Sequence, residues 1–518
     1  MSTQPTNDFD YQMASSKTVH TSVFPNANGI RFKNFTANIN TPSRPTLEVL
    51  YQRVALNAIR NEGGRADDAK CHPGTREEVI GLIERWMDST EVHRILWICG
   101  PAGGGKTAIM KTIIERSTTR DAHIVSFFFF RGDSTRKSAQ PLVATLIYQL
   151  LQLDSALSEA IAERFSTHPL ILGTSITEQC KLISMLAPTI RQSSPNTRII
   201  LLIDGLDECD VDAERSQREI VCALERLVME NDSPFRLLVT SRREAHIQMT
   251  FNQLPSPART IFLNDEYLPE KDVWVFVTAE FDKIKVSHPL ASSLPKHWPV
   301  PSDVENVVKK SSGQFIYAAT VMRYISHPST VPTLSLERVM GIVPPVNNSP
   351  FTNLDNIYTF ILDRANDEDA TRDILSMHML VMLTPTSMDL LAWYNSRYTK
   401  ALVESCVSQL SPIVTFYKHG NLRFYHASLD DFLRDRGRSG RYWVDIDAFR
   451  AKVLAVLWRK HIIDNTGDVH GDALVGLLSD LQKPTPDITH MLLHAPITRA
   501  AYLFRDHYDL LVIMRLVS

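Results

Sequence analysis

The first half of the chain alternates short, continuous apolar runs with longer segments of helical periodicity. Such runs are typical of strands buried on both faces, whereas apolar residues three and four positions apart indicate helices. The pattern predicts strands over residues 94–99, 123–130, 198–204, 235–240 and 259–263. Helical spacing over 138–153 and 214–230 places helices between them. This alternation predicts a doubly wound parallel sheet, and therefore an α/β fold.

Beyond residue 265 the predicted strands stop and amphipathic helices follow. One apolar stripe runs through 273–284 and another through 315–322, each with the spacing of a helix that packs in a core. The Pro- and Asn-rich segment 343–350 predicts a boundary, and helices are expected again over 351–409.

A hairpin is predicted after these helices. Alternating strands over 413–417 and 422–426 flank a turn that contains Gly420, and a helix is expected over 428–435. Helices, a hairpin and a further helix, in this order, describe a winged-helix unit. Such units usually bind DNA, but this hairpin carries little positive charge, so no nucleic-acid partner is expected.

These patterns divide the chain into six segments: a flexible N-terminal arm (1–60), a helical lead-in (61–92), the sheet domain (93–264), a helical domain (265–345), a winged-helix domain (346–438) and a C-terminal helical segment (439–518). The arm is rich in Ser, Thr, Asn and Pro and shows no sustained period. A helix over 74–87 is expected in the lead-in, with Thr75 as its N-cap and Glu78 three places on.

One glycine-rich motif follows the first predicted strand and opens a helix. It fits the phosphate-binding loop pattern and reads Gly100-Pro101-Ala102-Gly103-Gly104-Gly105-Lys106-Thr107, with Ala108 next. Glycines let successive N–H groups point at phosphate oxygens, and the helix N-terminus adds partial positive charge there. Lys106 is expected to reach the β- and γ-phosphates and the Thr107 hydroxyl to bind Mg²⁺. The sequence therefore predicts a nucleotide, ATP or ADP, with Mg²⁺.

Acidic residues end the third predicted strand. Asp204 is expected to approach the metal, because ligands bind at the carboxyl edge of a parallel sheet. Asp207 and Glu208, on the following turn, could orient or deprotonate the attacking water. Arg242, just after the fourth strand, could sense the γ-phosphate; its alternative role is an ordinary salt bridge with Glu208 or Glu244.

Composition places the chain among average globular proteins. Its 518 residues are 44 % apolar and 22 % charged, with a net charge of −3, which argues against a nucleic-acid footprint over the whole chain. The longest apolar runs are strand-length, and no secretion signal is recognisable, so a cytoplasmic protein without a transmembrane segment is expected. Six scattered cysteines without a C-x-x-C pair support neither a metal site nor a disulfide framework.

Taken together, the motifs resemble those of NACHT-type NTPases of the STAND signalling class, close to fungal proteins with a nephrocystin-like NTPase domain. The resemblance rests on residues 71–76, 100–107, 126–131, 202–208, 238–242, 313–319, 351–358 and 424–432, in this order. It implies that 93–264 is a NACHT P-loop NTPase domain. It also implies a closed state with ADP and an open state with ATP, in which opening permits self-association and signalling through protein partners of unknown identity.

The resemblance also implies that His426 contacts the β-phosphate of bound ADP and helps to hold the closed state; its alternative role is a packed interfacial histidine. Two features depart from the family pattern. Phe315 and Ile316 stand where related receptors often have a proline that lines the adenine pocket. The chain also carries neither a long repeat array after the winged helix nor an effector domain before the NTPase.

The leading hypothesis is a slowly hydrolysing ATPase that acts as a signalling switch, with a role in fungal non-self recognition or innate immunity as the family suggests. Two alternatives remain at the sequence level. One is a small-molecule kinase, which would need an acceptor pocket and an arginine-rich lid that are not evident. The other is a non-catalytic scaffold that uses the nucleotide only to fold.

Overall fold

The computed structural model describes residues 45–59, 70–89, 93–118, 122–154, 156–195, 197–209, 213–263, 267, 269–342, 351–381, 385–417, 421–459 and 477–478. The chain divides into two units, Met1–Pro45 and Thr46–Ser518. All features described below belong to the second unit.

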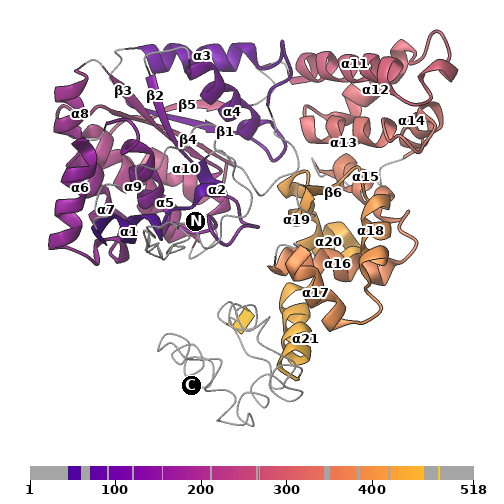
Figure 1. Cartoon of the computed structure of the whole chain (residues 1–518). Helices are drawn as coiled ribbons and strands as arrows, with labels where there is room; N and C mark the ends of the chain where they lie inside the picture. The colour runs from indigo at the N-terminus through magenta and orange to yellow at the C-terminus, as the bar shows by residue number, and fades with distance from the viewer. Residues whose placement is uncertain are drawn as a thin grey trace, which may run out of the picture. The chain divides into compact units, whose positions relative to one another are not determined.

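A five-stranded parallel sheet forms the centre of the first half of this unit, with the strand order β2-β3-β4-β1-β5 (Figure 1). Its strands are β1 (Ile95–Cys99), β2 (Ala122–Phe128), β3 (Arg198–Asp204), β4 (Phe235–Ser241) and β5 (Arg259–Phe262). All five predicted strands are confirmed; β3 has the predicted bounds, and the ends of the other four differ from the prediction by at most two residues.

Helices cover both faces of the sheet, because the strands carry apolar side chains on both faces. In β1, Leu96 and Ile98 face α3 (Glu77–Asp88) and α4 (Lys106–Ser117), whereas Ile95 and Trp97 belong to the core of the opposite face. The helices of that opposite face are α5 (Leu142–Leu150), α6 (Ala156–Thr167), α7 (Ile176–Ser184), α8 (Ala187–Ser193), α9 (Ala213–Met229) and α10 (Ala245–Asn252). The doubly wound α/β prediction is therefore confirmed.

Two short helices precede this domain, α1 (Pro45–Tyr51) and α2 (Leu56–Ile59). Leu50, Ala55 and Ala58 are buried in the core on the α5 side of the sheet. The prediction of a flexible arm over 1–60 is thus wrong for 45–59, while the rest of the arm lies outside the described residues. The apolar spacing of Leu47, Leu50 and Val54 spans only two turns, too short to stand out as a period.

The lead-in helix was predicted correctly, but its start was not. Arg76, with φ +60°, precedes the first residue of α3, and the Thr75 hydroxyl donates instead to the His72 carbonyl at 2.7 Å. Thr75 is therefore not the N-cap. The left-handed backbone at Arg76 turns the chain between Thr75 and the helix, which separates the hydroxyl from the helical N–H groups.

Where the structure describes the second half, it is helical apart from one hairpin. Its first helices are α11 (Pro269–Ser287), α12 (Pro301–Ser311), α13 (Phe315–Ile325) and α14 (Pro332–Met340). Then come α15 (Thr352–Leu362), α16 (Glu368–Val381), α17 (Pro385–Tyr394), α18 (Lys400–Gln409), the strands β6 (Val414–Tyr417) and β7 (Asn421–Phe424), and α19 (Ala427–Arg434), α20 (Arg436–Ser439) and α21 (Ile446–Trp458). We call residues 351–458 the hairpin domain.

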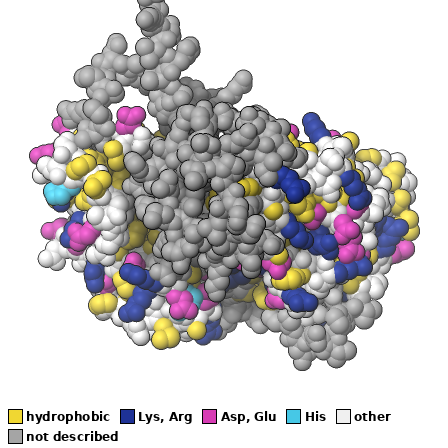
Figure 2. Space-filling model, turned by 90° about the horizontal axis from the view of Figure 1, so that it is seen from below, with side chains coloured by type: hydrophobic (Ala, Val, Ile, Leu, Met, Phe, Trp, Pro, Cys, Tyr) yellow, Lys and Arg dark blue, Asp and Glu magenta, His cyan; other side chains and the backbone are white. Residues whose placement is uncertain are grey.

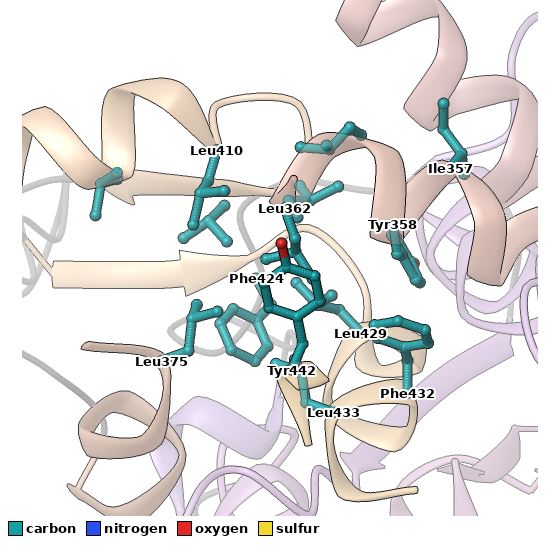
Figure 3. Close-up of a cluster of buried hydrophobic side chains, with 14 of the residues drawn as sticks. Ile357, Tyr358, Leu362, Leu375, Leu410, Phe424, Leu429, Phe432, Leu433 and Tyr442 are labelled. Atoms are coloured by element: carbon teal, nitrogen blue, oxygen red, sulfur yellow. The ribbon is translucent and has the colours of Figure 1, made fainter. Parts of the chain in front are cut away.

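The hairpin pairs β6 with β7 antiparallel, with Val414 opposite Phe424. Phe424 lies in a cluster with Leu362, Leu375 and Leu433 (Figure 3). The first two leucines belong to helices before the hairpin in the sequence, and Leu433 belongs to the helix after it. One continuous core runs from Val273 on α11 to residues beyond the hairpin. The predicted succession of helices, hairpin and helix is therefore present, and the predicted boundary at 343–350 lies outside the described residues.

The C-terminal segment is described only in part. The helix α21 begins at Ile446 and ends at Trp458, where Phe449, Val453 and Leu457 are buried in the same core. Most of 460–518 lies outside the described residues. On the face drawn in Figure 2, basic and acidic side chains lie intermixed, in line with the small net charge. In the described part of the chain, no helix is both long and apolar enough to span a membrane.

Candidate nucleotide-binding site

The glycine-rich loop lies between the carboxyl end of β1 and the first residue of α4, as predicted. Gly103 and Gly105 have φ of +74° and +88°, a backbone region that glycine enters without strain. Gly103 also lies directly against α13, because a Cβ on it would come within 2.2 Å of Ile316 Cγ2. The first turn of α13 therefore rests on the loop.

Lys106, the first residue of α4, folds back over the loop. Its ammonium donates to the carbonyl groups of Gly100 at 2.8 Å and Pro101 at 2.9 Å. Burial lowers the pKa of Lys106, and the carboxylate of Asp207 opposes this shift. A cation that is partly desolvated among carbonyl groups gains most from an anion placed beside it.

Thr107 and Asp204 meet at the edge of the sheet. The Thr107 hydroxyl donates to Asp204 Oδ2 at 2.8 Å, and Thr240 on β4 donates to Asp204 Oδ1 at 2.6 Å. A hydroxyl and a carboxylate are the hard oxygen ligands that Mg²⁺ prefers. No group of three or more His, Cys, Asp and Glu residues in the described ranges could hold a metal, so an ion here would complete its shell with phosphate oxygens and water. Thr240 is a contact that the sequence analysis did not single out.

Asp207 and Glu208 lie on the short 3-10 turn after β3, where Gly205 has φ +70°. Both oxygens of Asp207 are engaged by Arg242, Oδ1 by the backbone N–H at 2.9 Å and Oδ2 by Nε at 3.1 Å. Glu208 Oε2 accepts a hydrogen bond from the Arg131 backbone N–H at 3.4 Å. Asp207 is therefore held by Arg242 in this state.

Arg242 has a second acidic partner in the hairpin domain, Asp431 on α19, at 2.5 Å from Nη2. The sequence analysis proposed Glu208 or Glu244 as its acidic partner, and the structure adds Asp431, because an acid 189 positions away cannot be anticipated from local sequence. Burial by itself would lower the pKa of Arg242, but the carboxylates of Asp431 and Asp207 outweigh it and raise the pKa.

Arg76, within the segment 71–76, also reaches the loop, although its sequence context predicts no role for it. Its Nη2 donates to the Gly104 carbonyl at 3.0 Å, its guanidinium lies over the Phe315 ring at 5.1 Å, and its backbone N–H donates to Asp272 on α11 at 3.1 Å. Within the described residues, Arg76 Nε and Nη1 are buried without a hydrogen-bond partner, although Nε lies 3.9 Å from Asp272 Oδ2 in an ion pair. A ligand with acceptor atoms would satisfy them.

A single cavity of about 470 Å³ joins these groups. It is lined by loop residues 102–108, by Asp207, Glu208 and Arg242, by the first turns of α13, and by 425–427 of the hairpin domain. Gly100 and Pro101 contribute the carbonyl groups that hold Lys106, and Asp204 joins the site through Thr107. The structure thus brings together the residues that the sequence singled out.

His426 reaches this cavity as the N-cap of α19. Its Nδ1 accepts a hydrogen bond from the Ser428 backbone N–H at 3.0 Å, which fixes the ring at the start of the helix. Phe315 and Ile316 also line the cavity, at the place where the sequence departs from the proline of related receptors. This part of the cavity wall is therefore apolar.

Comparison with known proteins gives one family match and one curated relative. Residues 75–242 match the family model described as "Nephrocystin 3, N-terminal". The "Vegetative incompatibility protein HET-E-1" of Podospora anserina is 24% identical over 394 residues, which cover 72% of this chain and 26% of that protein. The chain therefore spans about a quarter of the length of the relative it matches.

Two solved structures show weaker likeness. A Walker-type ATPase of Pyrococcus abyssi has 12% identity and a TM-score of 0.36, covering 71% of this chain and 98% of that one. The ORC2 protein of Aeropyrum pernix, in complexes with ADPNP and ADP, has 10% identity and a TM-score of 0.33, covering 76% of this chain and 97% of that one. The family match, the curated relative and the loop on a parallel sheet together support placing this chain among the nephrocystin-like, NACHT-type P-loop NTPases.

Proposed function

We propose that the chain is an ATP-binding, slowly hydrolysing switch whose ADP-bound closed state and ATP-bound open state control self-association or partner binding. One observation carries the proposal: a single cavity is lined both by the phosphate-binding loop and by 425–427 of the hairpin domain. A ligand bound there would touch two parts of the chain at once, and could therefore favour one arrangement of them over another.

The residues around the loop fit a magnesium nucleotide. Lys106 and the loop N–H groups would hold the β- and γ-phosphates, and Thr107 with Asp204 would hold Mg²⁺, which supplies charge neutralisation when bound. Thr240 fixes the Asp204 carboxylate through Oδ1, which leaves Oδ2 directed toward Thr107. The buried donors of Arg76 favour a ligand that continues from the loop toward Phe315.

The ionic contacts of Asp207 support slow hydrolysis. A general base must be able to accept a proton from the attacking water. Arg242 contacts both carboxylate oxygens of Asp207, so both are already engaged. Water activation would then rest on Glu208, or on Asp207 after Arg242 has left it, and the ion pair that must first break would slow the second route.

His426 and the hairpin domain supply the closed-state contact in this proposal. The order of helices, hairpin and α19 supports a winged-helix unit, and His426 at the start of α19 would contact the β-phosphate of ADP. The name of the relative HET-E-1, a vegetative incompatibility protein, favours a role in fungal non-self recognition. On this view the protein partners are those of a cytoplasmic signalling complex.

A scaffold that uses nucleotide only for stability is the second candidate. It is favoured by the same engagement of Asp207, because a site that never hydrolyses its ligand needs no available base. The two functions differ in the fate of bound ATP, which becomes ADP over a long incubation only if the chain is a switch.

The proposal is tested by the nucleotide that the purified full chain carries. We expect about one ADP or ATP per chain after denaturation, and a loss of about tenfold to a hundredfold in affinity for Lys106→Ala, since a charge-assisted hydrogen bond contributes about 1.5–3 kcal/mol. Lys111→Ala, one turn further along α4, is the matched control and should bind like the parent. Equal nucleotide content in Lys106→Ala and the parent would refute the site.

A further inference from the structure

One aspartate of α19 faces the sheet domain. Asp431 lies 2.5 Å from Arg242 Nη2 and 3.9 Å from Arg131 Nη1, so two arginines of that domain approach a single carboxylate. The side chain of Asp431 is 16% exposed and that of Arg242 is 28% exposed, so water screens the contact only in part.

Arg242 forms ion pairs with two aspartates at once. Its Nε lies at 3.1 Å from Asp207 Oδ2, on its own domain, while Nη2 reaches across to Asp431. Arg131 follows the same pattern, since its Nη2 donates to the Asp207 carbonyl at 3.1 Å. Arg242 also lines the cavity that Lys106 lines, so it borders the same space that a terminal phosphate would enter.

We propose that Asp431 is a positioning residue that acts as the closed-state counter-ion of Arg242, in competition with the terminal phosphate of ATP. This inference rests on the proposed switch and adds how its site is regulated. A guanidinium held by Asp431 is not available to a phosphate, and a phosphate that captures it removes the ionic contact between α19 and the sheet domain. ADP lacks the competing group and leaves the contact intact.

The neighbouring residue provides a matched control. Asp430 is also an aspartate of α19, but it pairs with Arg434 of the same helix at 2.7 Å. Asp430→Asn and Asp431→Asn therefore make the same chemical change, one position apart, and only the second removes an ion pair to Arg242.

The test measures affinities of the full chain for ADP and for ADPNP, a non-hydrolysable ATP analogue, together with the release rate of a fluorescent ADP. For Asp431→Asn we expect the ratio of ADPNP to ADP affinity to rise about tenfold, within the usual range of coupling between sites, and ADP release to accelerate. Asp431→Glu should restore the parent ratio in part, because it restores the charge. Asp430→Asn should leave the ratio unchanged.

An unchanged ratio in Asp431→Asn overturns the inference, as does an equal change in Asp430→Asn. A contact that only stabilises the interface would alter both affinities equally and leave the ratio unmoved. Failure of the proposed function gives a different result. In that case the parent chain and Lys106→Ala would carry the same amount of nucleotide. If the parent binds nucleotide through Lys106 and the ratio does not respond to Asp431→Asn, the proposed function stands and the counter-ion role falls.

Discussion

At the scale of single residues, the site depends on how closely α13 approaches the glycine-rich loop. Gly103 combines a positive φ with contact to Ile316, so two independent constraints exclude a side chain there. Arg76, which also lies over the Phe315 ring of α13, adds a third contact by donating to the Gly104 carbonyl. The loop conformation is thus set by Arg76 and α13 as well as by its own glycines.

Gly103→Ala should destabilise the fold by about 1–3 kcal/mol, the usual cost of a strained backbone, and should also weaken nucleotide binding. Urea unfolding of the parent and the variant measures the first effect. Gly173→Ala is the control, because a Cβ there meets nothing within 4 Å. Equal unfolding midpoints for the two variants would show that α13 does not press on the loop.

The site residues at the glycine-rich loop could be predicted from the sequence, whereas most of the other residues around the cavity could not. Lys106, Thr107 and Asp204 lie at the ends of strands and helices whose patterns are local, and the structure brings them to one site. Arg76 and Asp431 gain their positions from contacts over 28 and 189 positions of sequence. No spacing rule covers such pairs, since they depend on how whole domains meet.

At the scale of elements, the hairpin is anchored by aromatic and buried polar contacts to the helices around it. His378 on α16 lies with its ring centroid 4.7 Å from that of Phe424 on β7. Burial, with a smaller contribution from the positive charge of Arg423, lowers the pKa of His378 from 6.5 to about 3. The folded chain therefore keeps this histidine neutral where an unfolded chain would protonate it.

The stability of the chain should consequently fall as the pH drops from about 6.5 toward 3, because the unfolded state then binds a proton that the folded state does not. His378→Phe should flatten this dependence, as measured by urea midpoints between pH 7 and pH 4.5. His168→Phe, at an exposed position, should leave it as in the parent. A parent-like pH dependence in His378→Phe would contradict this account.

Element types were predicted well, and element starts less well. The strands are buried on both faces, and such strands appear in the sequence as continuous apolar runs that are easily recognised. The start of α3 was wrong because a left-handed residue, Arg76, precedes it, and local capping residues cannot reveal this. The short helices α1 and α2 were missed because their burial comes from the sheet domain and not from their own periodicity.

At the scale of the whole molecule, the segment before the sheet domain is fixed by a buried ion pair. Arg136 Nε lies 3.0 Å from Asp133 Oδ2, with both side chains almost fully buried, and Arg136 Nη1 donates to the Asn57 carbonyl at 3.0 Å. The same loop after β2 carries Arg131, which contacts Asp207 and Asp431. The loop after β2 therefore contacts both α2, through Arg136, and the acidic partners of Arg242, through Arg131.

Arg136→Ala should destabilise the chain by about 3 kcal/mol, since it leaves the Asp133 charge buried. Hydrogen exchange should show that the amides of residues 45–59 lose more protection in Arg136→Ala than those of the rest of the described chain. Arg215→Ala breaks an exposed pair with Glu219 on α9 and should cost less than about 0.5 kcal/mol. Similar losses in the two variants would mean that the Arg136 pair does not fix the N-terminal helices.

The continuous core of the second half also determines what can move. Because Val273 on α11 and Leu457 on α21 belong to one packed cluster, helices and hairpin resist separation from each other. Their contacts with the sheet domain include the Arg76–Asp272, Gly103–Ile316 and Arg242–Asp431 pairs, all near the cavity. If the second half turned about these contacts as one body, residues far from the cavity would therefore move further than residues beside it.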